Sequence, residues 1–166
     1  DLGELRAALA ADRDTDPVSL VLAAWRRWGA ETLDRLCGSF AFALWDARVR
    51  RLTVVRDRFG IQPLAYAATP DRGVVAGDLS TVLAGLDAVP EIDCAWVAGF
   101  LSSQPLNAVR TAWKDVQRLP PGHLMVAEPD GTTTLRAWYR LERSAPPKTR
   151  DAAPALRAAL ALSLIH

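Results

Sequence analysis

The chain has few of the residues that build disulfide frameworks and metal centres. Its 166 residues include two cysteines, Cys37 and Cys94, and two histidines, His123 and His166. These numbers provide no disulfide scaffold, no zinc-ligand spacing and no His-rich metal site, so we expect no bound metal and a reducing, cytoplasmic environment. We also expect both cysteines to be small core residues. Cys37 leads into an apolar strand, and Cys94 lies on a predicted helix with no histidine near it in sequence.

Long apolar runs and blocks of one charge are also missing. No apolar stretch approaches the roughly 18 residues that span a bilayer. Lys and Arg number 20 against 19 Asp and Glu, for a net charge of +1. A nucleic-acid-binding surface needs a basic stripe, whereas the pairs Arg26-Arg27 and Arg50-Arg51 are isolated. We therefore expect neither a membrane nor a nucleic acid as a partner. With 50% hydrophobic residues, the sequence predicts one globular domain with a substantial core.

Residues 1–36 carry helical patterns. A short helix is expected at residues 3–10. A second helix has a clearer start, with Asp16 at the N-cap and Pro17 at its first position. Its apolar face is formed at i, i+3, i+4 and i+7 spacing by Val21, Ala24, Trp25 and Trp28. Gly29 is expected to end this helix.

The pattern changes to strands after residue 38. Residues 39–45 alternate, with one face formed by Phe40, Phe42 and Leu44, and they are expected to form a hairpin with residues 52–56. Further strands are predicted at residues 64–68, 73–76, 122–128 and 132–139. Helices are predicted at residues 79–86 and 93–101, the second capped by Asp93. Consecutive hairpins flanked by separate helices predict an α+β layered fold with antiparallel sheets.

The residues themselves reveal no catalytic constellation. We expect the triplet Arg56-Asp57-Arg58 beside Gly60 to form buried ion pairs that fix a turn, and His123 to be a hydrogen-bonded structural residue rather than a general base. The six tryptophans are expected to be core residues rather than a sugar-binding surface. Composition and spacing alone thus stop at a cytosolic α+β domain of unknown activity.

A set of motifs carries more information. The run Phe40-Ala41-Phe42-Ala43-Leu44-Trp45-Asp46 is followed by Arg56-Asp57-Arg58-Phe59-Gly60-Ile61-Gln62-Pro63-Leu64. Two later pieces are Arg118-Leu119-Pro120-Pro121-Gly122-His123 and the Asp130-Gly131 turn that leads to Trp138-Tyr139. In order and spacing, residues 1–141 resemble the N-terminal class II glutamine amidotransferase domain of glutamine-hydrolysing asparagine synthetases.

This resemblance implies a fold and a chemistry. The fold would be that of an N-terminal-nucleophile hydrolase, a four-layer αββα sandwich with antiparallel sheets, here lacking its N-terminal strands. In such enzymes an N-terminal Cys attacks the side-chain amide of glutamine, using its own α-amino group as the base, and an Asn-Gly pair stabilises the oxyanion. The ammonia released passes to a C-terminal synthetase domain, where ATP and Mg²⁺ activate an aspartate carboxylate.

Carried over to this chain, the resemblance assigns no catalytic, cofactor-binding or metal-binding residue. The nucleophile and the oxyanion residues would precede residue 1, and ATP and Mg²⁺ would bind in the C-terminal domain. One substrate-binding residue is assigned. In Thr15-Asp16-Pro17-Val18, Asp16 resembles the Asp of the family's Ser-Asp-Thr-Glu segment, which holds the amino group of glutamine; the same carboxylate could also serve only as an N-cap. The expected partners are glutamine, the protein's own synthetase domain and a second copy in a homodimer.

The expected domain organisation follows from composition. We assign residues 1–143 to the C-terminal portion of the amidotransferase domain, 144–154 to a linker, and 155–166 to the start of a synthetase-domain helix. The end, Leu162-Ser163-Leu164-Ile165-His166, is the peptide that a common sequencing adapter encodes. We expect it to be a sequencing artefact, the alternative being a natural helix end.

Departures from the family pattern leave other functions open. Gln62 stands where the family usually carries Lys, Ala65 where it carries Tyr, and residues 75–78 replace a Ser-Glu segment expected near the synthetase domain. These changes indicate a divergent member. The first alternative is a lasso-peptide macrocyclase or lactam synthetase relative whose amidotransferase domain is non-catalytic, and the second is a non-catalytic binding domain.

Overall fold

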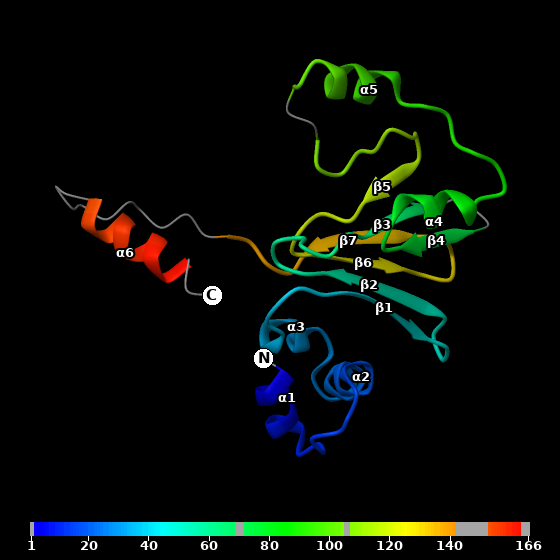
Figure 1. Ribbon diagram of the computed structural model, residues 1–166. Helices are drawn as coiled ribbons and strands as arrows, with labels where there is room; N and C mark the ends of the chain where they lie inside the picture. The colour runs from blue at the N-terminus through cyan, green and yellow to red at the C-terminus, as the bar shows by residue number, and fades with distance from the viewer. Residues whose placement is uncertain (1, 69–71, 105–106, 142–152, 164–166) are drawn as a thin grey trace.

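Two antiparallel sheets form the centre of the molecule (Figure 1). The computed structural model describes residues 2–68, 72–104, 107–141 and 153–163. Sheet A has the order β1-β2-β6-β7, and sheet B has the order β4-β3-β5. The strands of sheet A are β1 (Ala41–Asp46), β2 (Arg51–Arg56), β6 (His123–Ala127) and β7 (Thr133–Ala137). Those of sheet B are β3 (Ala65–Ala68), β4 (Gly73–Ala76) and β5 (Val116–Arg118).

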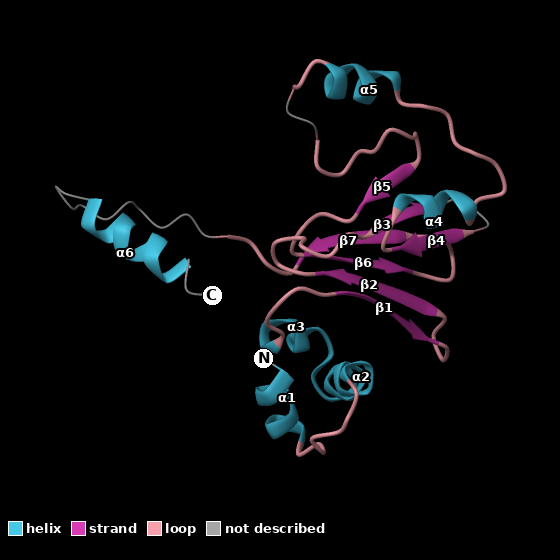
Figure 2. Cartoon of the chain, in the orientation of Figure 1, coloured by secondary structure: helices cyan, strands magenta, loops and turns pink. Residues whose placement is uncertain are grey.

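Helices flank the sheets (Figure 2). The first group comprises α1 (Leu2–Leu9), α2 (Pro17–Trp28), the 3₁₀ turn η1 (Gly29–Glu31) and α3 (Thr32–Arg35). Later in the chain come α4 (Leu79–Ala84), α5 (Cys94–Leu101) and α6 (Ala153–Ser163). Among the helices so described, none is long and apolar enough to cross a membrane.

The alternation of side chains along β2 builds the layers. Val54 and Val55 are both buried, but they point to opposite faces of sheet A. Val55 joins the core formed with α1, α2 and α3, whereas Val54 packs with Leu64 and Leu119 on the side of sheet B. The opposite face of sheet B, at Ala65 and Ala67, packs on Val82 of α4. The order of layers is therefore helices, sheet A, sheet B and helix, which confirms the predicted αββα arrangement.

The start of α2 also follows the sequence prediction. Asp16 is the N-cap, Pro17 is the first helical residue, and Gly29 ends the helix with φ 57°. Trp25, on the predicted apolar face, meets Phe42 of β1 edge to face at a centroid distance of 6.3 Å. Ala24, on the same predicted face, is 0% exposed, and so is Leu20, which lies outside the i, i+3, i+4, i+7 set.

Several expectations need correction. Strand β5 was not predicted, because its three residues are too few to show an alternating pattern. Cys37 and Cys94 are exposed and are not core residues. Cys37 lies in the loop before β1 rather than in the strand, and Cys94 is the first residue of an exposed helix. Trp45 is also 60% exposed, near the end of β1. The proposed linker falls mostly on residues 142–152, and the proposed artefact mostly on 164–166, which lie outside the described residues.

Burial in α2 leads to a stability prediction. Leu20 is 0% exposed and Leu22, two residues later, is 36% exposed. Replacing a buried leucine by alanine removes apolar contacts and leaves a cavity, so Leu20→Ala should lower the free energy of unfolding by about 2–5 kcal/mol. Leu22→Ala is the matched control and should cost clearly less. Urea unfolding curves of both variants measure the difference; equal losses would contradict the packing described for α2.

Candidate functional site

The loop that connects the two sheets is stabilised by hydrogen bonds between two of its side chains and its backbone groups. It follows β2 of sheet A and leads to β3 of sheet B. The guanidinium of Arg56, the last residue of β2, donates hydrogen bonds to three backbone carbonyls. Nε reaches the oxygen of Gln62 at 2.7 Å, Nη1 that of Leu119 at 2.6 Å, and Nη2 that of Gly60 at 2.6 Å. One side chain thus holds the loop and the segment after β5 against the end of β2.

The buried carboxylate of Asp57, the next residue, accepts hydrogen bonds from the backbone of the loop. Asp57 is 1% exposed. Its oxygens accept hydrogen bonds from the backbone N–H groups of Phe59 at 3.1 Å, Ile61 at 3.0 Å and Gln62 at 3.0 Å. Burial raises the pKa of Asp57, but these N–H donors outweigh it and hold the pKa below its ordinary value. The expectation of ion pairs was wrong. Arg56 and Asp57 fix the turn by hydrogen bonds to backbone carbonyls and backbone N–H groups, which are more numerous in a tight loop than charged side chains.

Two glycines let the loop and the later motif approach each other. Gly60 and Gly122 have φ values of 65° and 64°, a conformation that favours glycine. A Cβ at Gly60 would lie 2.8 Å from Pro121 Cγ, and one at Gly122 would lie 2.8 Å from the backbone oxygen of Tyr139. The backbone N–H of Gly122 also donates to the Asp57 carbonyl at 2.8 Å. Motifs separated by some sixty residues in sequence are thereby joined into one unit.

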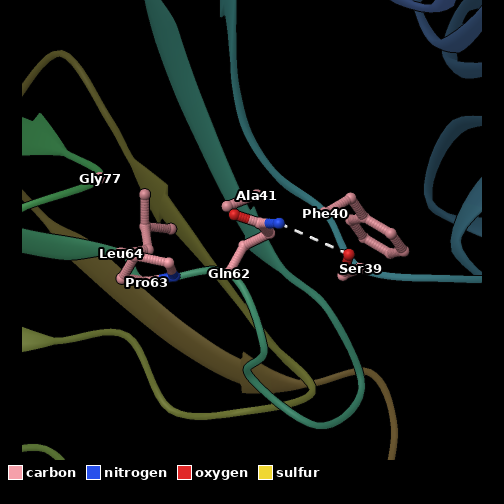
Figure 3. A pocket seen from close by; sticks show the side chains of 7 residues that line it. All are labelled: Ser39, Phe40, Ala41, Gln62, Pro63, Leu64 and Gly77. Atoms are coloured by element: carbon pink, nitrogen blue, oxygen red, sulfur yellow. Dashed lines mark hydrogen bonds between the residues drawn. The ribbon is translucent and has the colours of Figure 1, made fainter.

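Beside this loop lies an open hollow of about 390 Å³ (Figure 3). Its walls come from the start of β1, the approach to β3 and the end of β4, and they comprise Ser39, Phe40, Ala41, Gln62, Pro63, Leu64 and Gly77. The Gln62 side chain extends across it, with Nε2 3.4 Å from Ser39 Oγ. An amide and a hydroxyl on otherwise apolar walls could hydrogen-bond a small polar molecule. Gln62 and Gly77 belong to two of the places where the sequence departs from the family pattern, and the fold brings them together.

Asp16 lies elsewhere, on the helical layer. Its Oδ1 accepts hydrogen bonds from the backbone N–H groups of Val18 and Ser19, both at 3.0 Å. Hydrogen bonding to Ser19 is the main reason why the pKa of Asp16 is below its ordinary value. The side chain is exposed and does not line the hollow. The structure therefore confirms the capping role, whereas binding of a substrate ammonium by the same carboxylate stays a prediction.

A second hollow, of about 320 Å³, separates the end of β7 from the η1–α3 region. Its lining comprises Ala30, Glu31, Leu33, Asp34, Arg136, Ala137 and Trp138. Next to it, Arg58 donates to the Asp34 carbonyl at 3.1 Å and lies 5.8 Å from the ring centroid of Trp138. Arg58 thus stacks near an aromatic ring instead of forming the ion pair expected of the triplet.

Two further polar residues have structural roles. His123 Nδ1 donates to the Pro121 carbonyl at 2.8 Å, as expected of a structural histidine. Asp78, the last residue of the 75–78 segment that departs from the family pattern, caps α4 by accepting from the Thr81 N–H at 2.8 Å. Hydrogen bonds from Ser80 and Thr81 lower its pKa to about 2. An Asp followed by hydroxyl residues before an apolar run is the signal that could have identified this cap.

Comparison with known families gives the geometry a context. The family model described as "Glutamine amidotransferase domain" matches residues 2–139. A putative glutamine-hydrolysing asparagine synthetase of Mycobacterium tuberculosis is 34% identical over 149 residues, which cover 87% of this chain and 22% of that protein. Amidase chyE of Penicillium rubens is 33% identical over 130 residues, covering 77% of this chain and 18% of that protein. The chain thus spans about a fifth of the length of these relatives.

A solved structure shares the fold. Glutamine phosphoribosylpyrophosphate amidotransferase from Bacillus subtilis superposes with a TM-score of 0.52 at 15% sequence identity, over 82% of this chain and 26% of that one. At this identity the likeness concerns the fold alone. It agrees with the N-terminal-nucleophile hydrolase fold expected from the motifs.

The environment of Asp57 predicts a pH-dependent stability. Because its folded pKa lies below the ordinary value, its contribution is complete above the unfolded pKa of about 3.9 and is lost as the pH falls through the folded pKa. Asp57→Asn should therefore lower the free energy of unfolding by about 2 kcal/mol at pH 7, and by clearly less near pH 3. Urea unfolding at both pH values measures this, with the exposed Asp12→Asn as control. An equal loss at both values would show that the carboxylate charge is not responsible.

Proposed function

Because this chain belongs to the family of glutamine amidotransferase domains, we propose that it is part of a glutamine- and ATP-dependent amidotransferase related to asparagine synthetases. In this enzyme glutamine hydrolysis would supply ammonia to amidate an aspartate-type carboxylate. The observation that carries the proposal is the family match over residues 2–139, supported by relatives named as glutamine-hydrolysing asparagine synthetases. Since the chain spans about a fifth of those relatives, the whole reaction belongs to a longer protein.

Within that enzyme this chain would supply a scaffold and one substrate contact. The proposed nucleophile is an N-terminal Cys, whose α-amino group takes the thiol proton while the sulfur adds to the amide carbon of glutamine. The α-ammonium returns that proton to the leaving nitrogen, so the tetrahedral adduct releases ammonia and leaves a thioester. Water then hydrolyses the thioester to glutamate and the free thiol. In this proposal, these bond changes are assigned to no residue of the chain. The carboxylate of Asp16 is exposed and ionised at neutral pH, so it is suited to hold the α-ammonium of glutamine.

The proposed acceptor chemistry requires a second active site. ATP and Mg²⁺ would act in the synthetase portion of the longer, cytoplasmic protein, where they activate the acceptor carboxylate. The nucleotide and the metal ion would thus be bound outside this chain.

A different acceptor is the second candidate. It is favoured by the match to Amidase chyE. A name of that kind points to amide chemistry on a substrate other than aspartate, and a macrocyclase or lactam synthetase relative is the form of this alternative that the sequence left open. In the version with a non-catalytic amidotransferase domain, the residue after the initiator Met would not be Cys.

One experiment tests the proposal and its rival together. The complete protein is incubated with ATP, Mg²⁺, aspartate and either glutamine or ammonium, and glutamate, asparagine and AMP are measured. Asparagine formation from both nitrogen sources is the expected result. Glutamate release without aspartate-dependent formation of AMP would mean that the acceptor is a molecule other than aspartate. Absence of glutamate release would overturn the glutaminase proposal.

The 166-residue chain by itself should hydrolyse no glutamine. Acyl transfer depends on a nucleophile and on oxyanion donors, and the proposed site places both outside this chain. Purified chain incubated with glutamine should therefore release ammonia at the rate of buffer alone. Release above that rate, proportional to protein concentration, would mean that the catalytic groups have been misplaced.

Asp16 should affect glutamine binding in the complete enzyme without affecting stability. Asp16→Asn keeps the helix cap, because Asn caps about as well as Asp, but it removes the charge that would pair with the substrate ammonium. The KM for glutamine should rise on the order of tenfold, while activity with free ammonia and the Tm remain unchanged. Asp14→Asn, an exposed carboxylate two residues away, is the control. If both variants leave the glutamine KM unchanged, Asp16 is a cap only.

A further inference from the structure

Helix α5 has the composition of a buried helix but is not buried. Its eight residues, Cys94–Leu101, include two aromatic residues and no charged residue, and none of its side chains is buried. Phe100 is 60% exposed and Leu101 76% exposed. A helix that is apolar on all sides is normally covered by protein, and exposed apolar side chains gathered on one helix are typical of an interaction surface.

The exposed patch extends along the segment that leads into the helix. Val89 is 76% exposed and Ile92 is 59% exposed. Within the helix, the rings of Trp96 and Phe100 are stacked, with centroids 5.4 Å apart and planes inclined by 6°. Aromatic enrichment and a lack of charge are features of the buried centre of a stable interface, whereas a solvated helix carries charged side chains.

Hydrogen bonds nevertheless fix the start of the helix to the segment at residues 110–114. The backbone N–H of Asp93 donates to the Ala112 carbonyl at 2.8 Å, and that of Lys114 donates to the Glu91 carbonyl at 2.8 Å. Asp93 caps the helix through the Trp96 N–H at 3.1 Å and also pairs with Arg110. Figure 1 shows α5 at the top of the molecule, beyond sheet B. A rigid base that presents an apolar helix away from the sheets fits a docking element.

We propose that α5, together with Val89 and Ile92, is the surface on which the synthetase portion of the same polypeptide docks. This inference rests on the proposed function, in which the chain is part of a longer enzyme. The relatives supply the argument for this occupant: the chain covers 22% of the M. tuberculosis protein and 18% of chyE, so most of each relative is available to cover the patch. A covalently attached domain also has a high effective concentration, which suits a surface too apolar to be left in water.

Cys94 is a built-in reporter of this docking. It is the first residue of α5 and is exposed, and Leu101 follows seven residues later on the same helical face. Cys37, also exposed, lies before β1 and is an internal reference in the same molecule. Alkylation of both thiols by N-ethylmaleimide can be followed separately by peptide mass spectrometry in the native, complete enzyme.

Docking predicts that Cys94 reacts roughly tenfold or more slowly in the complete enzyme than in its Leu101→Asp variant, whereas Cys37 reacts at the same rate in both. Val49→Asp places the same charge on an exposed apolar residue of the β1–β2 turn and should leave both rates unchanged. A changed Cys37 rate in Leu101→Asp would indicate misfolding, and Leu101→Ser is then compared instead. The proposal is overturned if Cys94 reacts as fast in the native enzyme as in the folded variant.

A dilution series identifies the occupant. A photo-crosslinker attached to Cys94 of the monomeric enzyme then shows which segment covers it. A crosslink to a peptide that follows residue 166 supports the proposal, and a crosslink to a segment that precedes residue 1 overturns it. Protection that disappears together with a dimer assigns the surface to a second copy and overturns the proposal. Glutamate release by the same samples is scored separately, so loss of the proposed glutaminase function with Cys94 still protected can be distinguished from failure of docking.

Discussion

The arrangement of the two sheets depends on how one irregular loop satisfies its backbone. A loop without regular structure leaves N–H and C=O groups unpaired, and burying them is costly. Asp57 accepts from three of the N–H groups, and Arg56 donates to three carbonyls, one of them in a distant segment. Because Arg56 ends β2 and Leu119 follows β5, these bonds join sheet A to the strands of sheet B. The same segments supply the apolar contact between the sheets, where Val54 packs with Leu64 and Leu119.

Much of the fold could be predicted from sequence because its signals are local. The cap at Asp16, the stop at Gly29 and the β1–β2 hairpin each depend on neighbouring residues, and all were found. The misses depend on distant residues. Strand β5 forms because it pairs with the edge of β3. Whether Cys37 and Cys94 are buried or exposed depends on which distant segments pack against them, and both are exposed. The partners of Arg56 include a carbonyl 63 residues away, which no periodicity reveals.

The candidate site shows the same division. Sequence resemblance selected Asp16, and the structure places it on the helical layer, in a cap geometry that local sequence explains. The hollow at Gln62 could not have been predicted, because it requires Ser39, Gln62 and Gly77 to converge from three segments. Two of the departures from the family pattern meet there. This coincidence makes the hollow a place where the chemistry of a divergent member can differ from that of its relatives.

The double burial of β2 has a consequence for how chains of this kind can diverge. Val54 serves one core and Val55 the other, so a one-residue insertion within the strand would exchange the two sets of side chains. Beyond the inserted residue, each core would then receive the residues shaped for its counterpart, and the cross-strand partners on β1 and β6 would be mismatched. Natural length variation should therefore accumulate in the turn at residues 47–50 and beyond residue 68, whereas the length of β2 should stay constant.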